Sequence, residues 1–272
     1  MRPERLARTL LSGVVACTVV ALTPPTAFTQ KASSPNRVVD LLAHDKVVLG
    51  WFAPARTPDA AKRAAGDHQM DFVFLNMEQV NSYNAAEVKA FHDALRERNS
   101  AENPGPAFML RLPIFHDDPA AARRRVTDVL NIGVDAVVFP DMESADEARQ
   151  ALESMGKDKL YPQNPNGSLA SIFIVESEKG IANSREITRE RPTVAIPGPG
   201  TLSRVYNRDM AKVENAIQTQ LASCKEFKVP CGITANAGDV TKRIKEGFKV
   251  IIIYDRDYPE TIKVAREAAG RE

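Results

Sequence analysis

The stretch Ala136-Val-Val-Phe-Pro-Asp-Met142 decides the fold class. Its β-branched and apolar residues, followed by polar ones, are typical of a short strand. Apolar residues at three- and four-residue spacing lie on both sides, over residues 120–131 and 145–155, and predict amphipathic helices. A strand between two helices is the repeating unit of a parallel sheet, so this stretch predicts an α/β fold.

The same unit recurs along the chain. Short β-branched runs cover residues 47–53, 71–77, 108–113, 136–142, 171–177, 193–198, 231–236 and 250–255. Further helical patterns cover residues 85–98, 210–226, 240–246 and 258–269. Eight strands with helices over roughly 220 residues favour a single-domain (β/α)₈ TIM barrel at residues 47–272. An open doubly wound sheet is the alternative, but no Gly-rich dinucleotide turn follows the first strand.

The first 29 residues have a different composition. Three arginines in the first eight residues precede an apolar run at 9–22, followed by prolines and small residues. This order predicts a signal peptide at residues 1–29, and residues 30–46 then form a linker that leads into the barrel. The run is about fourteen residues long, short of the roughly twenty that span a bilayer. We therefore expect an exported protein, periplasmic or secreted, without stable membrane insertion after cleavage.

A retained anchor and a lipoprotein, suggested by Val14-Val15-Ala16-Cys17, are the alternatives for this leader. Without residues 1–29, the formal charge of +1 falls to near −1, because three Arg and one Glu are removed. This balance gives no electrostatic reason to expect nucleic acid or an anionic membrane as partner. Cys224 and Cys231 remain, either as a disulfide or as two buried thiols.

Polar residues follow the predicted strands, where a TIM barrel carries its chemistry. They are Trp51, Glu78 with Gln79, Arg111, Asp141 with Glu143, Glu176, Gly198-Pro199-Gly200, Asn236 and Asp255. An arginine can bind a carboxylate by a two-point fork, while carboxylates can hold a divalent metal. The set suits a small anionic substrate, although acidic residues at these positions also cap helices.

Several short motifs, taken in order, resemble the HpcH/HpaI aldolase/citrate lyase family. They are Gly50-Trp51, residues 71–79, Leu110-Arg-Leu-Pro113, residues 133–140 with 143–148, residues 175–183 with Glu186-Ile187, Gly198-Pro199 and Gly247-Phe248. The resemblance implies a (β/α)₈ barrel that cleaves or forms carbon–carbon bonds next to a pyruvate-like or acyl-CoA-derived enolate. It also implies a divalent metal, Mg²⁺ or Mn²⁺, and a homo-oligomer.

The resemblance assigns roles to individual residues. Arg111 looks like the arginine that binds the substrate carboxylate and stabilises the enolate oxygen, and Glu176 looks like the first metal-binding carboxylate. Each has a structural alternative: Arg111 as an ion-pair partner of Glu78 or Asp141, and Glu176 as a buried helix cap. We assign the substrate pocket to Arg111 together with Trp51, Gly198, Pro199, Gly200 and Thr201.

Two positions depart from the family pattern. Gln79 stands where the family has its catalytic acid/base histidine in Asp-x-Glu-His, and an amide does not titrate near neutral pH. Thr201 stands where Gly-Pro-x-Asp-Leu supplies the second metal carboxylate. His116 is a candidate for a relocated base, or else an exposed loop residue. Asp141 is a candidate for the replacement metal ligand, or else a helix cap.

The remaining histidines, His44, His68 and His92, have no motif around them, and we interpret them as surface or structural residues. The sequence favours a metal-assisted carbon–carbon lyase, aldolase-like, acting on a small 2-oxo acid or related carboxylate. The rival is an exported carboxylate-binding protein or pseudoenzyme on the same barrel. An enzyme with unrelated chemistry is a third hypothesis, because a fold does not fix a function.

Overall fold

The structure is a computed structural model that describes residues 36–79, 83–97, 99–100 and 104–271. These residues belong to one compact unit. The predicted signal peptide at 1–29 lies outside the described residues and stays a prediction. No helix within the described ranges is long and apolar enough to cross a membrane.

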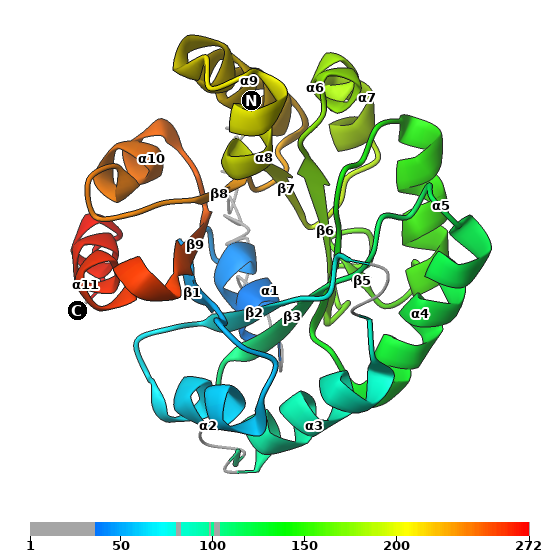
Figure 1. Ribbon diagram of the computed structural model, residues 1–272, viewed down its shortest axis with the longest axis vertical. Coiled ribbons are helices and arrows are strands. Elements are labelled where there is room, and N and C mark those ends of the chain that lie inside the picture. The colour runs from blue at the N-terminus through cyan, green and yellow to red at the C-terminus, as the bar shows by residue number, and fades with distance from the viewer. Residues whose placement is uncertain (1–35, 80–82, 98, 101–103, 272) are drawn as a thin grey trace, which may run out of the picture. The chain divides into compact units, whose positions relative to one another are not determined.

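A curled, wholly parallel sheet forms the centre of the fold (Figure 1). Its strands are β1 (Val48–Phe52), β2 (Phe72–Asn76), β3 (Ala107–Arg111), β4 (Ala136–Phe139), β5 (Leu160–Tyr161), β6 (Leu169–Val175), β7 (Val194–Pro197), β8 (Gly232–Thr234) and β9 (Val250–Tyr254). The pairing order runs β8-β9-β1-β2-β3-β4-β6-β7, and a bridge between Ala195 and Cys231 joins β7 to the start of β8. The predicted α/β fold is confirmed, and the arrangement is TIM-barrel-like.

Helices surround the sheet (Figure 1). They are α1 (Arg37–Ala43), α2 (Pro58–Gly66), α3 (Ala85–Arg96), α4 (Pro119–Ile132), α5 (Ala145–Met155), α6 (Glu178–Ala182), α7 (Ser184–Arg189), α8 (Pro199–Val205), α9 (Met210–Phe227), α10 (Val240–Glu246) and α11 (Tyr258–Ala268), with a 3₁₀ turn at Asp255–Asp257. Helices α3, α4, α5, α9, α10 and α11 lie where the periodicity predicts them. Helices α1, α2, α6, α7 and α8 have no counterpart among the predicted helical patterns.

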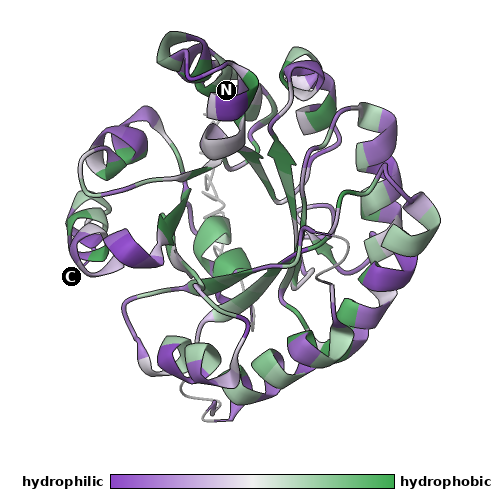
Figure 2. Ribbon diagram, in the orientation of Figure 1, coloured by the Kyte–Doolittle hydropathy of each residue, from purple (hydrophilic) through white to green (hydrophobic). Residues whose placement is uncertain are grey.

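The core has two layers. Alternate strand residues point into the barrel and form an inner apolar cluster, while the others pack outward against the helices. Figure 2 shows this as apolar strands inside helices whose outer faces are hydrophilic. Gly50 belongs to the inner layer, where a Cβ would lie 2.4 Å from the Phe72 ring, so its lack of a side chain admits that ring. Because one apolar cluster lies inside the sheet and the other outside it, both faces of the strands are apolar, as expected for a covered parallel sheet.

Helix α1 lies inside the ring of helices (Figure 1), and its Val38, Val39 and Leu42 pack on the inner cluster. The segment interpreted as a linker thus contains a helix. Its N-cap, Asn36, accepts hydrogen bonds from the backbone N–H groups of Val38 and Val39 and donates to the carbonyl of Asp135 at 2.7 Å. These contacts attach α1 to the amino-terminal ends of the strands.

Asp71 ties the same end of the barrel together. It immediately precedes β2 and is fully buried. Its carboxylate accepts hydrogen bonds from Arg37 Nε at 2.8 Å, from Arg271 Nη2 at 2.8 Å and from the backbone N–H of Leu49 at 2.9 Å. One carboxylate is therefore held by two arginines that come from the first and last parts of the described chain.

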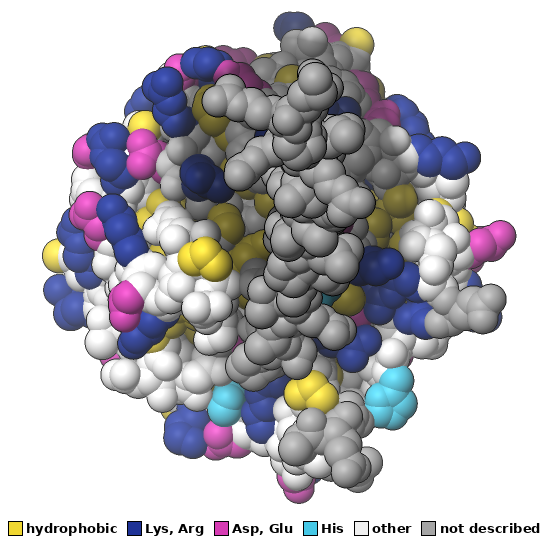
Figure 3. All heavy atoms as spheres, turned by 180° about the vertical axis from the view of Figure 1, so that it is seen from behind, with side chains coloured by type: hydrophobic (Ala, Val, Ile, Leu, Met, Phe, Trp, Pro, Cys, Tyr) yellow, Lys and Arg dark blue, Asp and Glu magenta, His cyan; other side chains and the backbone are white. Residues whose placement is uncertain are grey.

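The charged side chains on the surface and the state of the two cysteines can be compared with the expectations from the sequence. In the view from behind (Figure 3), basic and acidic side chains both lie around the periphery, as the near-neutral charge predicts. Cys224 and Cys231 are both buried and both free, so the structure holds the pair as two thiols. Burial raises the pKa of the Cys231 thiol, which keeps it protonated and unreactive.

Candidate active site

A cavity of about 180 Å³ opens at the carboxyl ends of the strands. Its charged lining residues are Glu78, Arg111, Glu176 and Arg204. The remaining lining residues are Phe52, Phe74, Asn76, Ile174, Ile196, Pro197, Gly198, Pro199, Gly200, Thr201, Thr234, Ile252 and Tyr254. The position agrees with the general rule for TIM barrels, in which the residues at the strand ends perform the chemistry.

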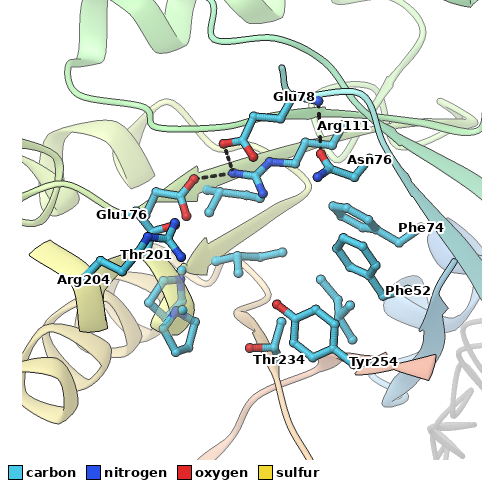
Figure 4. A pocket seen from close by; sticks show the side chains of 17 residues that line it. Phe52, Phe74, Asn76, Glu78, Arg111, Glu176, Thr201, Arg204, Thr234 and Tyr254 are labelled. Atoms are coloured by element: carbon cyan, nitrogen blue, oxygen red, sulfur yellow. Dashed lines mark hydrogen bonds and ion pairs between the residues drawn. The ribbon is translucent and has the colours of Figure 1, made fainter. Parts of the chain in front are cut away.

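Arg111 lies at the centre of the charged side of this cavity (Figure 4). It is the last residue of β3, and its Nη2 donates to Glu78 Oε1 at 2.6 Å and to Glu176 Oε1. Its Nε is buried and has no hydrogen-bond partner among the described residues. The expected structural pairing with Glu78 is present, and an unsatisfied buried donor remains beside it, which favours a site that is completed by a ligand.

Glu176 follows β6 directly, and only 4% of its side chain is exposed. Burial raises its pKa above the ordinary glutamate value, and the charge of Arg111 opposes that shift. A hydrogen bond from Thr201 also favours the ionised form. A Cβ at Gly198 would lie 2.2 Å from Glu176 Oε2 and 2.7 Å from Glu176 Cβ, so glycine at 198 permits this close packing.

Arg204 occupies the cavity wall next to Glu176 and Thr201 (Figure 4). It lies one turn after Thr201 on α8, and its Nη2 donates to the Thr201 hydroxyl at 3.1 Å. The Thr201 hydroxyl thus accepts from Arg204 and donates to Glu176. The Gly198-Pro199-Gly200 segment forms the N-cap and the beginning of this short helix.

The opposite wall of the cavity is aromatic (Figure 4). The ring of Phe52 stacks on Phe74 at a centroid distance of 5.1 Å and contacts Tyr254, also at 5.1 Å. The Tyr254 hydroxyl points into the cavity, and burial raises the pKa of this phenol, which keeps it protonated. The cavity therefore has a charged side and an apolar side.

Trp51 does not reach this cavity, which corrects one expectation. Its side chain points outward, its Nε1 donates to Asp255 Oδ1 at 3.0 Å, and its ring packs near Arg63 and Tyr258. Gly50 and Phe52, the residues on either side of Trp51, face the barrel interior instead, because side chains alternate along a strand. Phe52 forms the wall that we assigned to Trp51.

His116 and Gln79 also lie outside the lining of this cavity. His116 borders a separate surface cleft, where its Nδ1 lies 3.0 Å from Glu147 Oε1. Burial raises the pKa of Glu147, and the bond to His116 opposes that shift. Gln79 is exposed, and its neighbour Glu78 is the residue that lines the cavity. The structure therefore does not bring the proposed relocated base to Arg111.

The predicted metal ligands do not fit a shared metal ion in this cavity. Glu176 lines it but is already hydrogen-bonded by Arg111 and Thr201, and Asp141 is not among the lining residues. One buried oxygen of Asp141 has no hydrogen-bond partner in the described part of the chain, yet no three His, Cys, Asp or Glu side chains converge there as a metal-holding group. Hard divalent cations take most protein ligands from carboxylates, and Thr201 supplies only a hydroxyl.

The sequence matches the family model described as HpcH/HpaI aldolase/citrate lyase over residues 48–225, more than half of the chain. The chain belongs to the HpcH/HpaI aldolase/citrate lyase family. This is a family of aldolase- and citrate lyase-like enzymes, and the match specifies no substrate for this chain. No curated protein sequence matches the chain.

Solved structures agree with this family at the level of the fold. An HpcH/HpaI family protein from Burkholderia cenocepacia J2315 superposes with a TM-score of 0.66 at 21% identity, covering 86% of this chain and 97% of that one. A citrate synthase gives 0.65 at 18% identity, with coverages of 85% and 96%. Macrophomate synthase gives 0.65 at 18% identity, with coverages of 89% and 93%. These similarities support the shared barrel of the HpcH/HpaI family and no particular reaction.

Proposed function

We propose that the protein is a carbon–carbon lyase that acts on a small 2-oxo acid or related carboxylate through an enolate. The supporting observation is the Arg111 guanidinium, held between Glu78 and Glu176 at the carboxyl ends of the strands and facing a cavity. A planar, permanently charged donor stabilises a developing enolate oxygen more strongly in a buried site than in water. Two synthases, macrophomate synthase and a citrate synthase, share this fold.

The proton step is assigned to Glu176. Because burial raises its pKa, this carboxylate is better matched to proton transfer near neutral pH than an ordinary glutamate. In the cleavage direction, Glu176 removes the proton from the C4 hydroxyl of a 4-hydroxy-2-oxo acid. The C3–C4 bond breaks, its electron pair forms the C2–C3 double bond, and the C2 oxygen becomes an enolate oxygen beside Arg111. C4 leaves as a carbonyl compound, and Glu176 returns the proton to C3.

The Mg²⁺ or Mn²⁺ that the family resemblance implies takes part in no step of this scheme. That the activity depends on this ion stays a prediction, since Glu176 and Asp141 do not both face the cavity. When bound in a relative that fits it, such an ion would polarise the carbonyl oxygen of the substrate. In this chain, Arg111 is the group positioned for that role.

A carboxylate-binding protein is the second candidate function. Asn76, Gln79 and Thr201 are neutral at positions where the family pattern has Asp, His and Asp. Of these three, Asn76 and Thr201 line the cavity. Such a site keeps the cation that binds a carboxylate but has lost titrating groups.

An activity assay distinguishes the two functions. A series of 4-hydroxy-2-oxo acids is offered to the protein with and without Mg²⁺ or Mn²⁺, and the release of pyruvate is measured in a coupled assay. The lyase predicts pyruvate release that requires Arg111 and Glu176. The variant Gln79→His/Thr201→Asp is the informative comparison. Activity that arises only in this double variant, with none in the wild type, supports the binding protein and contradicts the lyase.

We also propose that the chain is exported and forms a homo-oligomer. The leader supports export, because cationic, apolar and small residues follow one another in residues 1–29. The family resemblance supports the oligomer. Both proposals can be tested on protein recovered from outside the cytoplasm. Its amino terminus tests the cleavage of the leader, and its mass in solution tests the oligomer. An intact Met1 or a monomer would contradict the respective part.

A further inference from the structure

The two arginines of the cavity differ in their partners. Arg111 is already bound to Glu78 and Glu176. Arg204 hydrogen-bonds the neutral Thr201 and, within the described residues, forms no ion pair with a carboxylate. Aspartate at position 201, as in the family pattern, would place a negative charge beside this guanidinium. Threonine holds Arg204 in position without neutralising it.

The local charges make Arg204 the cation that is open to a ligand. Among the charged lining residues, Arg111 forms ion pairs with both carboxylates, Glu78 and Glu176, whereas Arg204 forms none within the described residues. Arg204 is an exposed residue that lines the cavity, and its guanidinium can bind a carboxylate by charge-assisted hydrogen bonds.

The size and the opposite wall of the cavity indicate what else the ligand carries. An apolar cavity of about 150 Å³ accommodates a benzene ring, and this cavity measures about 180 Å³. The rings of Phe52, Phe74 and Tyr254 form a continuous surface across from Arg204 (Figure 4). Aromatic rings pack favourably on such a surface in offset or tilted arrangements. A three-carbon 2-oxo acid would leave this surface uncovered.

We propose that Arg204 binds the carboxylate of an aromatic 2-oxo acid whose ring packs on Phe52, Phe74 and Tyr254. The guanidinium of Arg204 thereby supplies a second positive charge to the site, in addition to that of Arg111. This inference rests on the proposed function for the 2-oxo group, which lies beside Arg111, but it concerns binding and specificity. It can therefore be tested without turnover.

The test is titration calorimetry of the full chain with phenylpyruvate and with pyruvate, both in the presence of a chelator. We expect phenylpyruvate to bind at least about tenfold more tightly than pyruvate, because the ring buries apolar surface on the aromatic wall. Arg204→Met should weaken phenylpyruvate binding by about tenfold or more, and Arg204→Lys should recover part of the loss. Phe52→Ala should weaken phenylpyruvate binding much more than pyruvate binding.

Arg256→Met is the matched control. Arg256 also approaches the Tyr254 ring, at 5.9 Å, but does not line the cavity, so its substitution changes the net charge equally and should leave affinity unchanged. Thermal unfolding of each variant verifies that it is folded. Equal affinity for the two acids, unchanged binding in Arg204→Met, or binding that disappears with the chelator would each overturn the inference. Tight chelator-resistant binding without lyase activity would retain it and reject the lyase.

Discussion

Each end of the barrel has a cluster of arginine and carboxylate side chains, but the numbers of the two are reversed. At the amino-terminal end, one carboxylate, Asp71, is held by two arginines and a backbone N–H, and its carboxylate oxygens are fully used. At the carboxyl end, one arginine, Arg111, is held by two carboxylates, and its Nε remains without a partner among the described residues. Asp71 is fully buried and does not line the cavity, whereas the second cluster borders it. The comparison separates an ion pair that stabilises the fold from one that is prepared for a ligand.

Arg111→Met should have the largest effect on function. Loss of one donor to a developing oxyanion typically lowers the rate by about 10² to 10³. We expect a drop of that size in kcat/KM together with a loss of thermal stability, because the substitution leaves the buried Glu176 without its cationic partner. Steady-state kinetics and thermal unfolding on the same preparation measure both quantities. A variant that unfolds but keeps its activity per folded molecule would make Arg111 a structural residue.

Asp71→Asn should lower the stability alone. Removal of one partner from a buried ion pair costs about 3–5 kcal/mol, and we expect a loss of about 3 kcal/mol because Arg37 is partly exposed. Denaturant unfolding gives the free energy, and ligand affinity of the folded fraction should be unchanged. Asp45→Asn is the control at the same end, since Asp45 pairs with Lys249 on the surface and should alter stability little. Similar losses in both variants would remove the distinction between the Asp71 cluster and the surface.

Glycine 198 tests how closely the functional cluster is packed. Gly198→Ala places a Cβ against Glu176 and should displace this carboxylate, which lowers kcat/KM by about tenfold or more. Gly200→Ala is the matched control, because a Cβ there meets nothing within 4 Å. Both variants add the same methyl group to neighbouring positions that line the cavity. Equal kinetics for the two would show that the position of Glu176 does not limit the reaction.

The sequence predicts the fold well and the site in part. The eight strands follow from β-branched runs between helical patterns, and each run overlaps an observed strand, with ends that differ by at most three residues. Arg111 and Glu176 follow from the family motifs. The sequence does not show which strand side chains face the interior. In a sheet covered on both faces, Trp51 and Phe52 are equally apolar candidates for that position. Only the ring of strands, with Gly50 beside Phe72, determines which of the two faces the cavity.

The other misses have local causes. Arg204 lies on α8, a seven-residue helix, and the Gly-Pro-Gly start of that helix reads as a turn in the sequence. His116 lies five residues after Arg111, but the chain leaves the barrel after β3 and takes the imidazole to Glu147. A signal for the aromatic wall existed in Phe52, Phe74 and Tyr254, which occupy inward positions near the ends of neighbouring strands.

The pH dependence of stability should distinguish Glu176 from an ordinary surface ion pair. Since burial raises the pKa of Glu176, its contribution to stability is fully present below about pH 4.3 and is lost as pH rises through the folded-state pKa. The wild type should thus become less stable relative to Glu176→Gln over that rise.

Glu214 gives the opposite sign and serves as the control. Arg243 lowers the pKa of Glu214 to about 2, so its contribution is present above about pH 4.3 and is lost as pH falls through 2. Urea unfolding of the wild type, Glu176→Gln and Glu214→Gln between pH 3 and pH 8 measures the differences. If the difference in stability between the wild type and Glu176→Gln changed with pH in the same direction as that between the wild type and Glu214→Gln, the assignment of Glu176 as a carboxylate destabilised by burial would be contradicted.

The most direct test of enolate chemistry at Arg111 is exchange of the C3 protons of pyruvate and phenylpyruvate with solvent deuterium, followed by NMR. The wild type, Arg111→Met and buffer alone are compared with and without Mg²⁺. The account predicts exchange by the wild type well above buffer for at least one of the two acids, and loss of that excess in Arg111→Met. Exchange equal to buffer for both acids under every condition, or exchange that persists in Arg111→Met, would contradict it.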